Sequence, residues 1–129
     1  MCGIVGYIGN KKASDIILNS LKRLEYRGYD SAGISTIENN KIKTSKCKGK
    51  ILELENLPTI VEHKNCIGIG HTRWATHGEP NTDNAHPHQD LSNKFSLIHN
   101  GIIENHYSIK EYLVNNGVEF TSDTDTEVL

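Results

Sequence analysis

The sequence lacks the features that mark membrane, exported and nucleic-acid-binding proteins. No apolar run approaches the length of a membrane span, and no basic segment followed by an apolar one opens the chain. The 14 basic and 16 acidic side chains nearly cancel to a formal net charge of −2, which gives no electrostatic footprint for nucleic acid or an anionic membrane. We therefore expect a cytoplasmic protein that binds neither, and whose partner is recognised by a local site.

Cysteine is also scarce. Cys2, Cys47 and Cys66 are odd in number, far apart and in no Cys-x-x-Cys spacing, which argues against a disulfide framework and against a cysteine zinc site. The chain needs no such staple, because 129 residues, 36% of them hydrophobic, are enough for one domain with a sizeable core. The composition is that of an ordinary globular protein, so its function has to be sought in its motifs.

The first motif is Met1-Cys2-Gly3. If the initiator methionine is removed, Cys2 carries both a thiol and a free α-amine. An ordinary thiol has a pKa of about 8.5 and an α-amine one of about 7.7 to 8.0, so moving the thiol proton onto the amine costs only about 1 kcal/mol. The sequence therefore predicts a nucleophile activated by its own amine. The alternative is an ordinary cysteine beside an unprocessed terminus.

Patterns typical of helices and strands alternate along the chain, which predicts an α+β fold. In the first half we expect a buried strand over residues 3–9 and a helix over 11–26, capped by Asn10 and stopped by Gly28. A hairpin that turns at residues 38–41 should follow, because asparagine tolerates the positive φ of tight turns. The second half is expected to contain a strand over 95–99, a helix over 102–116 with Tyr112 facing inward, a short strand over 118–120 and a capping box from Thr124 to Glu127.

The densest polar stretch covers residues 71–88 and is expected to form a strand end followed by a long loop, which is usually a functional feature. Arg73 offers a guanidinium fork for a carboxylate and Trp74 can wall a small pocket, so the pair suits a small ligand that carries an acid. A zinc site is the competing hypothesis, but no His-Glu-x-x-His helix or cysteine ligand supports it, and we expect neither metal nor cofactor. The histidines that would form it are His71, His77, His86 and His88.

Two glycine-containing pairs complete the candidate residues. Asn100-Gly101 follows a predicted strand and can supply an amide N–H and a backbone N–H to an oxyanion, where one donor is worth about 3 to 4 kcal/mol in acyl transfer. A simple turn is the competing interpretation. Arg27-Gly28 lies in a polar segment over residues 26–33, which is either part of a site or a helix stop with a solvated Arg-Asp pair.

Together these motifs resemble the glutaminase domain of glucosamine-6-phosphate synthases, which are class II glutamine amidotransferases of the N-terminal-nucleophile (Ntn) hydrolase fold. The resemblance covers essentially the whole chain and implies an αββα sandwich. The segments that carry it are CGIVG at 2–6, YRGYDSAG at 26–33, HTRWATHGEP at 71–80, NAHPH at 84–88, HNGIIEN at 99–105 and SDTDTEV at 122–128.

The resemblance implies a catalytic role for three residues. Cys2 would attack the carboxamide of glutamine with its own amine as base, forming a γ-glutamyl thioester that water hydrolyses to glutamate. Asn100 and Gly101 would hold the oxyanion. Arg27 and Gly28 would support the nucleophile without contacting the substrate.

The resemblance also implies a binding role for five residues around L-glutamine. Arg73 would grip the α-carboxylate and Asp125 the α-ammonium group. Trp74, Thr76 and His77 would shape the pocket. A site with a cation for one end of an amino acid and an anion for the other rejects ligands that lack either charge.

Domains of this family are about twice as long and precede sugar isomerase domains that bind fructose 6-phosphate. We therefore expect residues 1–129 to form the N-terminal part of a glutaminase domain, with a sandwich left incomplete at Leu129. The full-length enzyme is expected to be a homodimer that aminates fructose 6-phosphate. The alternative is a truncated, non-catalytic fragment that acts as a binding or assembly module.

Overall fold

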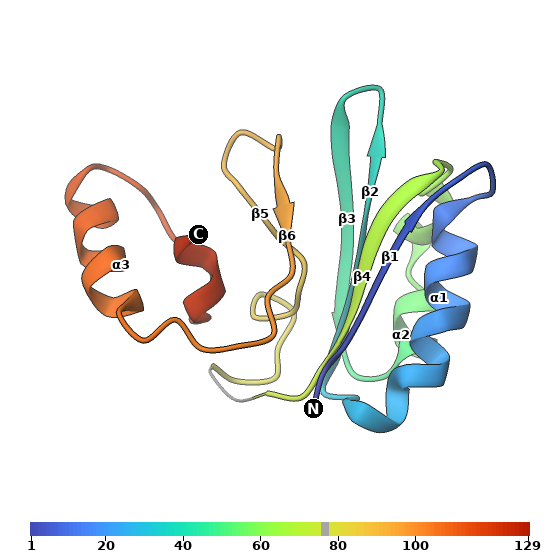
Figure 1. The fold of residues 1–129 in the computed structure, drawn as a ribbon, viewed down its shortest axis with the longest axis horizontal. Helices are drawn as coiled ribbons and strands as arrows, with labels where there is room; N and C mark the ends of the chain where they lie inside the picture. The colour runs from blue at the N-terminus through green and yellow to red at the C-terminus, as the bar shows by residue number, and fades with distance from the viewer. Residues whose placement is uncertain (76–77) are drawn as a thin grey trace.

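The architecture centres on a four-stranded antiparallel sheet (Figure 1), seen in a computed structural model that describes residues 1–75 and 78–129. The predicted pocket residues Thr76 and His77 lie outside the described residues. The strand order is β1-β4-β2-β3. The strands are β1 (Gly3–Ile8), β2 (Ser31–Glu38), β3 (Lys41–Lys48) and β4 (Ile67–Arg73).

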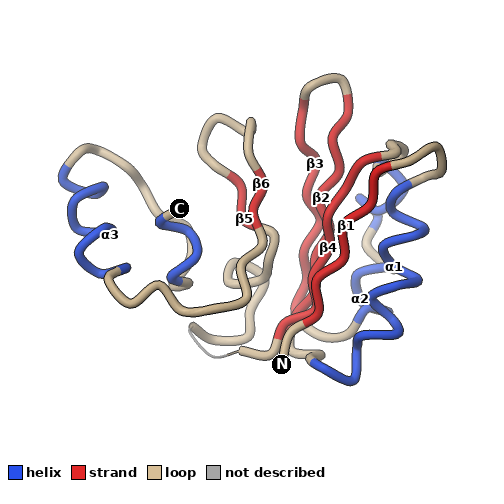
Figure 2. The backbone as a smooth tube through the Cα atoms, in the orientation of Figure 1, coloured by secondary structure: helices blue, strands red, loops and turns tan. Residues whose placement is uncertain are grey.

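Two helices, α1 (Ala13–Leu24) and α2 (Ile51–Glu55), cover one face of this sheet (Figure 2). A short 3-10 helix, η2 (Pro58–Glu62), follows α2. Ile17 and Leu21 of α1 are fully buried against β4, where a Cβ atom added to Gly70 would lie 2.3 Å from Ile17 Cγ2. The glycine therefore lets the helix approach the sheet closely.

On the other face, β5 (His88–Gln89) and β6 (Ser96–Leu97) form a two-stranded ribbon. Its contacts with the large sheet include hydrogen bonds from Ser96 Oγ to Ser35 Oγ at 2.8 Å and from Gln89 Nε2 to the Ile42 carbonyl at 3.4 Å. Beyond the ribbon lie α3 (His106–Asn115) and the 3-10 helix η3 (Asp125–Val128) (Figure 1). The order of layers is thus helix, sheet, ribbon, helix.

The first-half predictions are partly confirmed. The hairpin turns at Asn39 and Asn40, whose φ angles of 50° and 60° are in the left-handed region. The predicted first helix begins two residues late, at Ala13, because Lys12 is the N-terminal cap; the proposed Asn10 cap is wrong. The strand itself forms, but its predicted burial is wrong for most of β1. This strand lies at the edge of the described sheet, beside β4, and its Ile8 is 77% exposed.

In the second half, a helix forms over α3, but no residue within this fully described helix is buried and Tyr112 is 68% exposed, so its inward placement is wrong. Residues 118–120 form no strand. The capping box is also wrong, because the Glu127 carboxylate accepts hydrogen bonds from the backbone N–H groups of Thr121 and Ser122 (2.8 and 2.7 Å) rather than from Thr124. Glu127 therefore closes the loop that precedes η3.

Candidate active site

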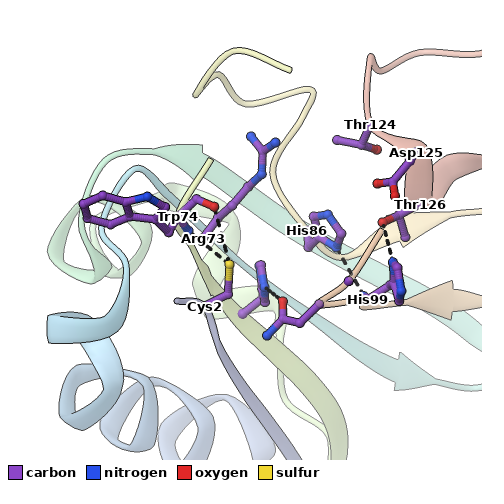
Figure 3. A pocket seen from close by; sticks show the side chains of 11 residues that line it. Cys2, Arg73, Trp74, His86, His99, Thr124, Asp125 and Thr126 are labelled. Atoms are coloured by element: carbon purple, nitrogen blue, oxygen red, sulfur yellow. Dashed lines mark hydrogen bonds between the residues drawn. The ribbon is translucent and has the colours of Figure 1, made fainter. Parts of the chain in front are cut away.

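Segments from five parts of the chain line one small pocket that is open to solvent and has a cavity volume of about 40 Å³ (Figure 3). They are the N-terminus, the end of β4, the segment before β5, the turn after β6 and the start of η3. The lining residues are Cys2, His71, Arg73, Trp74, His86, His99, Asn100, Gly101, Thr124, Asp125 and Thr126.

Cys2 is held at the mouth of the pocket by the end of β4. Its Sγ atom accepts a hydrogen bond from the Trp74 N–H at 3.2 Å and lies 3.6 Å from the Trp74 carbonyl oxygen. The next residue is anchored as well, because the Gly3 N–H donates to Thr72 Oγ1 at 3.2 Å within the buried interior. The pairing of β1 with β4 and these hydrogen bonds thus fix the position of the Cys2 sulfur.

The segment over residues 26–33 packs against the end of β4 that holds Cys2. A Cβ atom added to Gly28 would lie 2.7 Å from the carbonyl carbon of Arg73, so only glycine allows the two backbones to approach so closely. Gly28 does follow the last helical turn, η1 (Glu25–Arg27), but its φ of 179° is extended backbone, not a left-handed helix stop. Arg27 Nη2 lies 3.8 Å from Met1 Sδ, beside the nucleophile.

Asp30 of the same motif fixes the segment that carries Arg73 and Trp74. Its backbone N–H donates to the Arg73 carbonyl at 3.0 Å, and its Oδ2 accepts from the Ala75 N–H at 2.9 Å. The alternative interpretation of this segment, a solvated Arg-Asp pair, is therefore wrong for Asp30, because its carboxylate accepts a hydrogen bond from the backbone.

Opposite charges occupy different parts of the pocket lining. Arg73 and Asp125 are each only 4% exposed. Burial lowers the pKa of Arg73, and the nearby Asp30 and Asp125 carboxylates act in the opposite direction. Asp125 Oδ2 accepts a hydrogen bond from the Ile103 N–H at 2.7 Å, which ties η3 to the turn that follows Asn100. The pocket therefore presents a buried cation and a buried anion to one small ligand.

Asn84 links the loop after β4 to the segment that carries Asp125. Its side chain is fully buried; Oδ1 accepts from the Asp123 N–H at 2.8 Å and Nδ2 donates to the Glu79 carbonyl at 3.0 Å. Arg73 Nη1 donates to the same Glu79 carbonyl at 3.3 Å. The buried Asn84 amide thus connects the loop that contacts Arg73 with the segment that leads to Asp125.

Asn100 and Gly101 form the turn after β6. Asn100 Oδ1 lies 2.7 Å from His71 Nε2. A Cβ atom added to Gly101 would lie 2.6 Å from Nε2 of His99, which leaves room only for a hydrogen there. The backbone N–H of this residue is consequently not shielded by a side chain of its own.

Three of the four histidines in the zinc hypothesis have rings in contact, one pair tilted and the other edge-on. The His71 and His86 ring centroids are 4.7 Å apart, and those of His86 and His88 are 4.6 Å apart. Burial lowers the pKa to about 4 for His71 and His88 and to about 2 for His86, so the rings are neutral near pH 7. Within residues 1–75 and 78–129 no group of three potential ligands is arranged for a metal ion.

The structure brings together six predicted site residues, namely Cys2, Arg73, Trp74, Asn100, Gly101 and Asp125. Sequence reasoning treated His71 and His86 only as potential zinc ligands and did not assign His99, Thr124 or Thr126. All five lie in the motifs quoted for the resemblance, and all except His86 are one or two residues from an assigned residue. That closeness in sequence was the available signal.

A layered α+β fold with a cysteine, a cation and an anion around one pocket defines the Ntn type of glutamine amidotransferase domain. Comparison with known proteins agrees: the family model described as "Glutamine amidotransferase domain" matches residues 58–129. The chain belongs to this family, and the expected α+β Ntn fold is confirmed.

Among curated relatives, glutamine--fructose-6-phosphate aminotransferases [isomerizing] are similar over the whole chain. Identities are 59% for the enzyme of Pyrococcus horikoshii, 56% for that of Aquifex aeolicus and 54% for that of Clostridium tetani. The chain covers 100% of its own length in these matches but only 21–22% of the relatives. It therefore spans about a fifth of their length.

Solved structures give the same family. The glutamine phosphoribosylpyrophosphate (PRPP) amidotransferase from B. subtilis, complexed with ADP and GMP, superimposes with a TM-score of 0.82 at 30% identity. A structure described as the allosteric regulatory enzyme of purine biosynthesis gives 0.84 at 31% identity. Each match covers 99% of this chain and 28% of the other. Separately, none of the helices in the described part of the chain is long and apolar enough to span a membrane.

Proposed function

We propose that this domain hydrolyses L-glutamine to glutamate and ammonia, with Cys2 as the nucleophile. The observation that carries the proposal is the pocket itself, in which a buried guanidinium, a buried carboxylate and the Cys2 sulfur face one small space (Figure 3). These groups match the α-carboxylate, the α-ammonium group and the side-chain amide of one amino acid.

The chemical step follows from the groups present. Cys2 Sγ forms a bond to the carboxamide carbon while the α-amine of Cys2 takes the thiol proton. The amine then gives this proton to the departing nitrogen, the C–N bond breaks, and ammonia leaves a γ-glutamyl thioester. Water adds to the thioester, the C–S bond breaks, and glutamate and the free thiol are regenerated.

Donors at the turn after β6 stabilise the charge that develops in both steps. The Asn100 side-chain amide and the Gly101 backbone N–H hold the carbonyl oxygen as it becomes an oxyanion. Removal of Met1 is required, because the nitrogen of Cys2 is otherwise an amide without a basic lone pair. Gly28 acts as a support through its close approach to the Arg73 backbone, and Arg27 as a support from the segment beside the N-terminus.

Substrate recognition is assigned to the two buried charged residues of the pocket. Arg73 binds the α-carboxylate and Asp125 the α-ammonium group. Trp74, 45% exposed and edge-on to Tyr29 at 5.9 Å, walls the open side of the pocket. Thr76 and His77 are proposed to complete that wall, although both lie outside the described residues.

The names of the relatives suggest where the ammonia goes. Since the curated relatives described above are called glutamine--fructose-6-phosphate aminotransferases, we assign this chain to the glutaminase half of such an enzyme. In a protein of that kind, residues outside this chain bind fructose 6-phosphate, and ammonia released here aminates it to glucosamine 6-phosphate. The cytoplasm and a homodimer fit that role.

The test is glutamate release from L-glutamine by protein from which Met1 has been removed. The unsubstituted protein should release glutamate, Cys2→Ala should abolish release, and Cys66→Ala should not, because Cys66 does not line the pocket. Release that survives Cys2→Ala would refute the nucleophile. A folded, Met1-free protein that binds glutamine without hydrolysing it would support the alternative of a non-catalytic binding module.

A further inference from the structure

One contact in the pocket is not explained by substrate binding or by the nucleophile. His71 lies in β4 and is 1% exposed, yet its Nε2 atom is 2.7 Å from Oδ1 of Asn100. Asn100 is the residue to which the proposed function assigns an oxyanion donor. What His71 does to Asn100 therefore bears on the reaction.

The contact decides which end of the Asn100 amide faces the pocket. A primary amide has an acceptor oxygen and a donor NH₂ group on the same carbon. When Oδ1 is engaged by a donor on one side, the NH₂ group points to another side. A donor on His71 thus leaves Nδ2, the only part of the side chain that can stabilise an oxyanion, free to serve the substrate.

The surroundings of His71 indicate which ring nitrogen carries the proton. Its Nδ1 atom is buried and has no hydrogen-bond partner. A proton on Nδ1 would be an unpaired buried N–H, which proteins rarely tolerate, whereas a proton on Nε2 is used in the bond to Asn100. Burial also lowers the pKa of His71 to about 4, so the ring carries one proton near pH 7.

The ring of His71 is held rigidly. Its backbone pairs with Gly33 of β2 and with Ile4 of β1, so strands on both sides fix the position of its Cα atom. The His86 ring covers it at a centroid distance of 4.7 Å. A donor on such a support orients a flexible side chain at little further cost in entropy.

We propose that His71 is a positioning residue for glutamine hydrolysis, whose Nε2–H holds Asn100 with its NH₂ group turned toward the oxyanion. The inference rests on the proposed function and adds a determinant of kcat at the same site. Because the donor acts on charge that develops only in the transition state, losing it should lower kcat and leave KM unchanged.

The test is a double-mutant cycle in the native, Met1-free protein, with glutamate release as the readout. Losing one oxyanion donor costs about 100- to 1,000-fold in kcat, so Asn100→Ala should show a loss of that size. His71→Leu should lower kcat by about 10- to 100-fold with KM changed less than about two-fold. In the Asn100→Ala background, His71→Leu should cost less than about three-fold more.

A second variant keeps the test decisive if His71→Leu does not fold. His71→Gln places an amide donor near the position of Nε2 and should keep at least about a third of the unsubstituted kcat. Alkylation of Cys2 by iodoacetamide, which forms no oxyanion, should proceed at the same rate in every folded variant. These results would distinguish lost positioning from a damaged nucleophile.

The inference would be overturned if His71→Leu lowered kcat equally with and without Asn100, or if a folded His71→Gln protein lost as much activity as His71→Leu. It would also be overturned if Asn100→Ala left kcat unchanged. Failure of the proposed function appears differently, as an unsubstituted Met1-free protein that releases no glutamate.

Discussion

At the scale of single residues, the site depends on two charges that the fold keeps out of water. A buried charge is tolerated when it is paired or hydrogen-bonded, and leaving one without its partners is costly. Arg73 donates to the Glu79 carbonyl and Asp125 accepts from the Ile103 N–H, so hydrogen bonds within the protein compensate part of the cost of burying these charges. A bound amino acid would bring a carboxylate to Arg73 and an ammonium group to Asp125, which makes charge the main source of specificity.

Arg73→Lys tests this at the same scale. Lysine keeps the positive charge but loses the planar fork that binds a carboxylate through two parallel hydrogen bonds. We expect KM for glutamine to rise by about 10- to 100-fold, equivalent to about 1.4 to 2.8 kcal/mol of binding. Steady-state glutamate release measures the effect. Arg23→Lys, on the exposed side of α1, is the matched control and should change KM less than about two-fold; an unchanged KM in Arg73→Lys would contradict the assignment.

At the scale of elements, the end of β4 is the part on which the others are assembled. β1 brings Cys2 to it, the segment after η1 packs beneath it, and η3 faces it across the pocket. Because strands are stiff and each is paired along its length, a small displacement of one backbone moves several site groups together. Close packing below the site should therefore matter as much as the site residues themselves.

Gly28→Ala tests the packing. The added Cβ would lie 2.7 Å from backbone atoms of Arg73, which cannot rotate away, so we expect a loss of about 1 to 3 kcal/mol in the free energy of unfolding and a lower kcat. Gly6→Ala is the matched control, because nothing lies within 4 Å of its added Cβ. Urea unfolding and glutamate release measure both variants. Equal behaviour of the two would contradict the proposed support.

Elements set by local chemistry could be predicted from the sequence, and those set by distant contacts could not. The turn at Asn39-Asn40 was predictable because asparagine accepts a positive φ. The apolar residues of β1 predicted a buried strand. They carry no information about which strand lies at the edge of the sheet, so the exposure of β1 was not predictable. Glu127 was assigned to a cap from its spacing, whereas the folded chain offers it the N–H groups of Thr121 and Ser122.

The candidate site shows the same division. Cys2, Arg73 and Asn100 were predictable because each side chain has a chemistry that stands out in its motif. The orientation of Asn100 by His71 was not predictable, because 29 positions separate the two residues. His71 lies in β4 of the large sheet and Asn100 follows β6 of the ribbon, and the packing of the two sheets brings the side chains within 2.7 Å. Sequence thus indicated which groups react, and the structure indicates how they are held.

At the scale of the whole molecule, buried neutral histidines hold the layers together. His63, 1% exposed, joins β2 and β3 through hydrogen bonds between its two ring nitrogens and the hydroxyl groups of Thr36 and Ser45, each at 2.8 Å. Burial lowers the pKa of His63, as it does those of His71 and His88. His88 joins the ribbon to the segment before η3 through Thr124 at 2.9 Å. Protonating these rings should therefore separate the layers.

This arrangement predicts loss of stability in mild acid. A histidine whose pKa is lowered by folding takes up a proton more readily in the unfolded chain, so its contribution is complete above about pH 6.5 and declines as the pH falls below that value. Each such histidine should remove up to about 1.4 kcal/mol per pH unit in this range. Urea unfolding at pH 7.5, 6 and 5 measures the decline.

His63→Gln isolates one part of that decline, because glutamine can still hydrogen-bond but does not titrate. We expect the variant to be less stable than the unsubstituted protein at pH 7.5, with the difference shrinking toward pH 5. A difference that stays constant across this range would show that His63 does not become protonated on unfolding.

The central claim, that Cys2 with a free amine attacks an amide held by the surrounding pocket, is tested most directly by intact mass after incubation with a glutamine-analogue electrophile. The account predicts one adduct per chain on Cys2 in protein that lacks Met1, competed by L-glutamine and abolished by Cys2→Ala. A folded, Met1-free protein that remains unlabelled, or is labelled equally after Cys2→Ala, would contradict it.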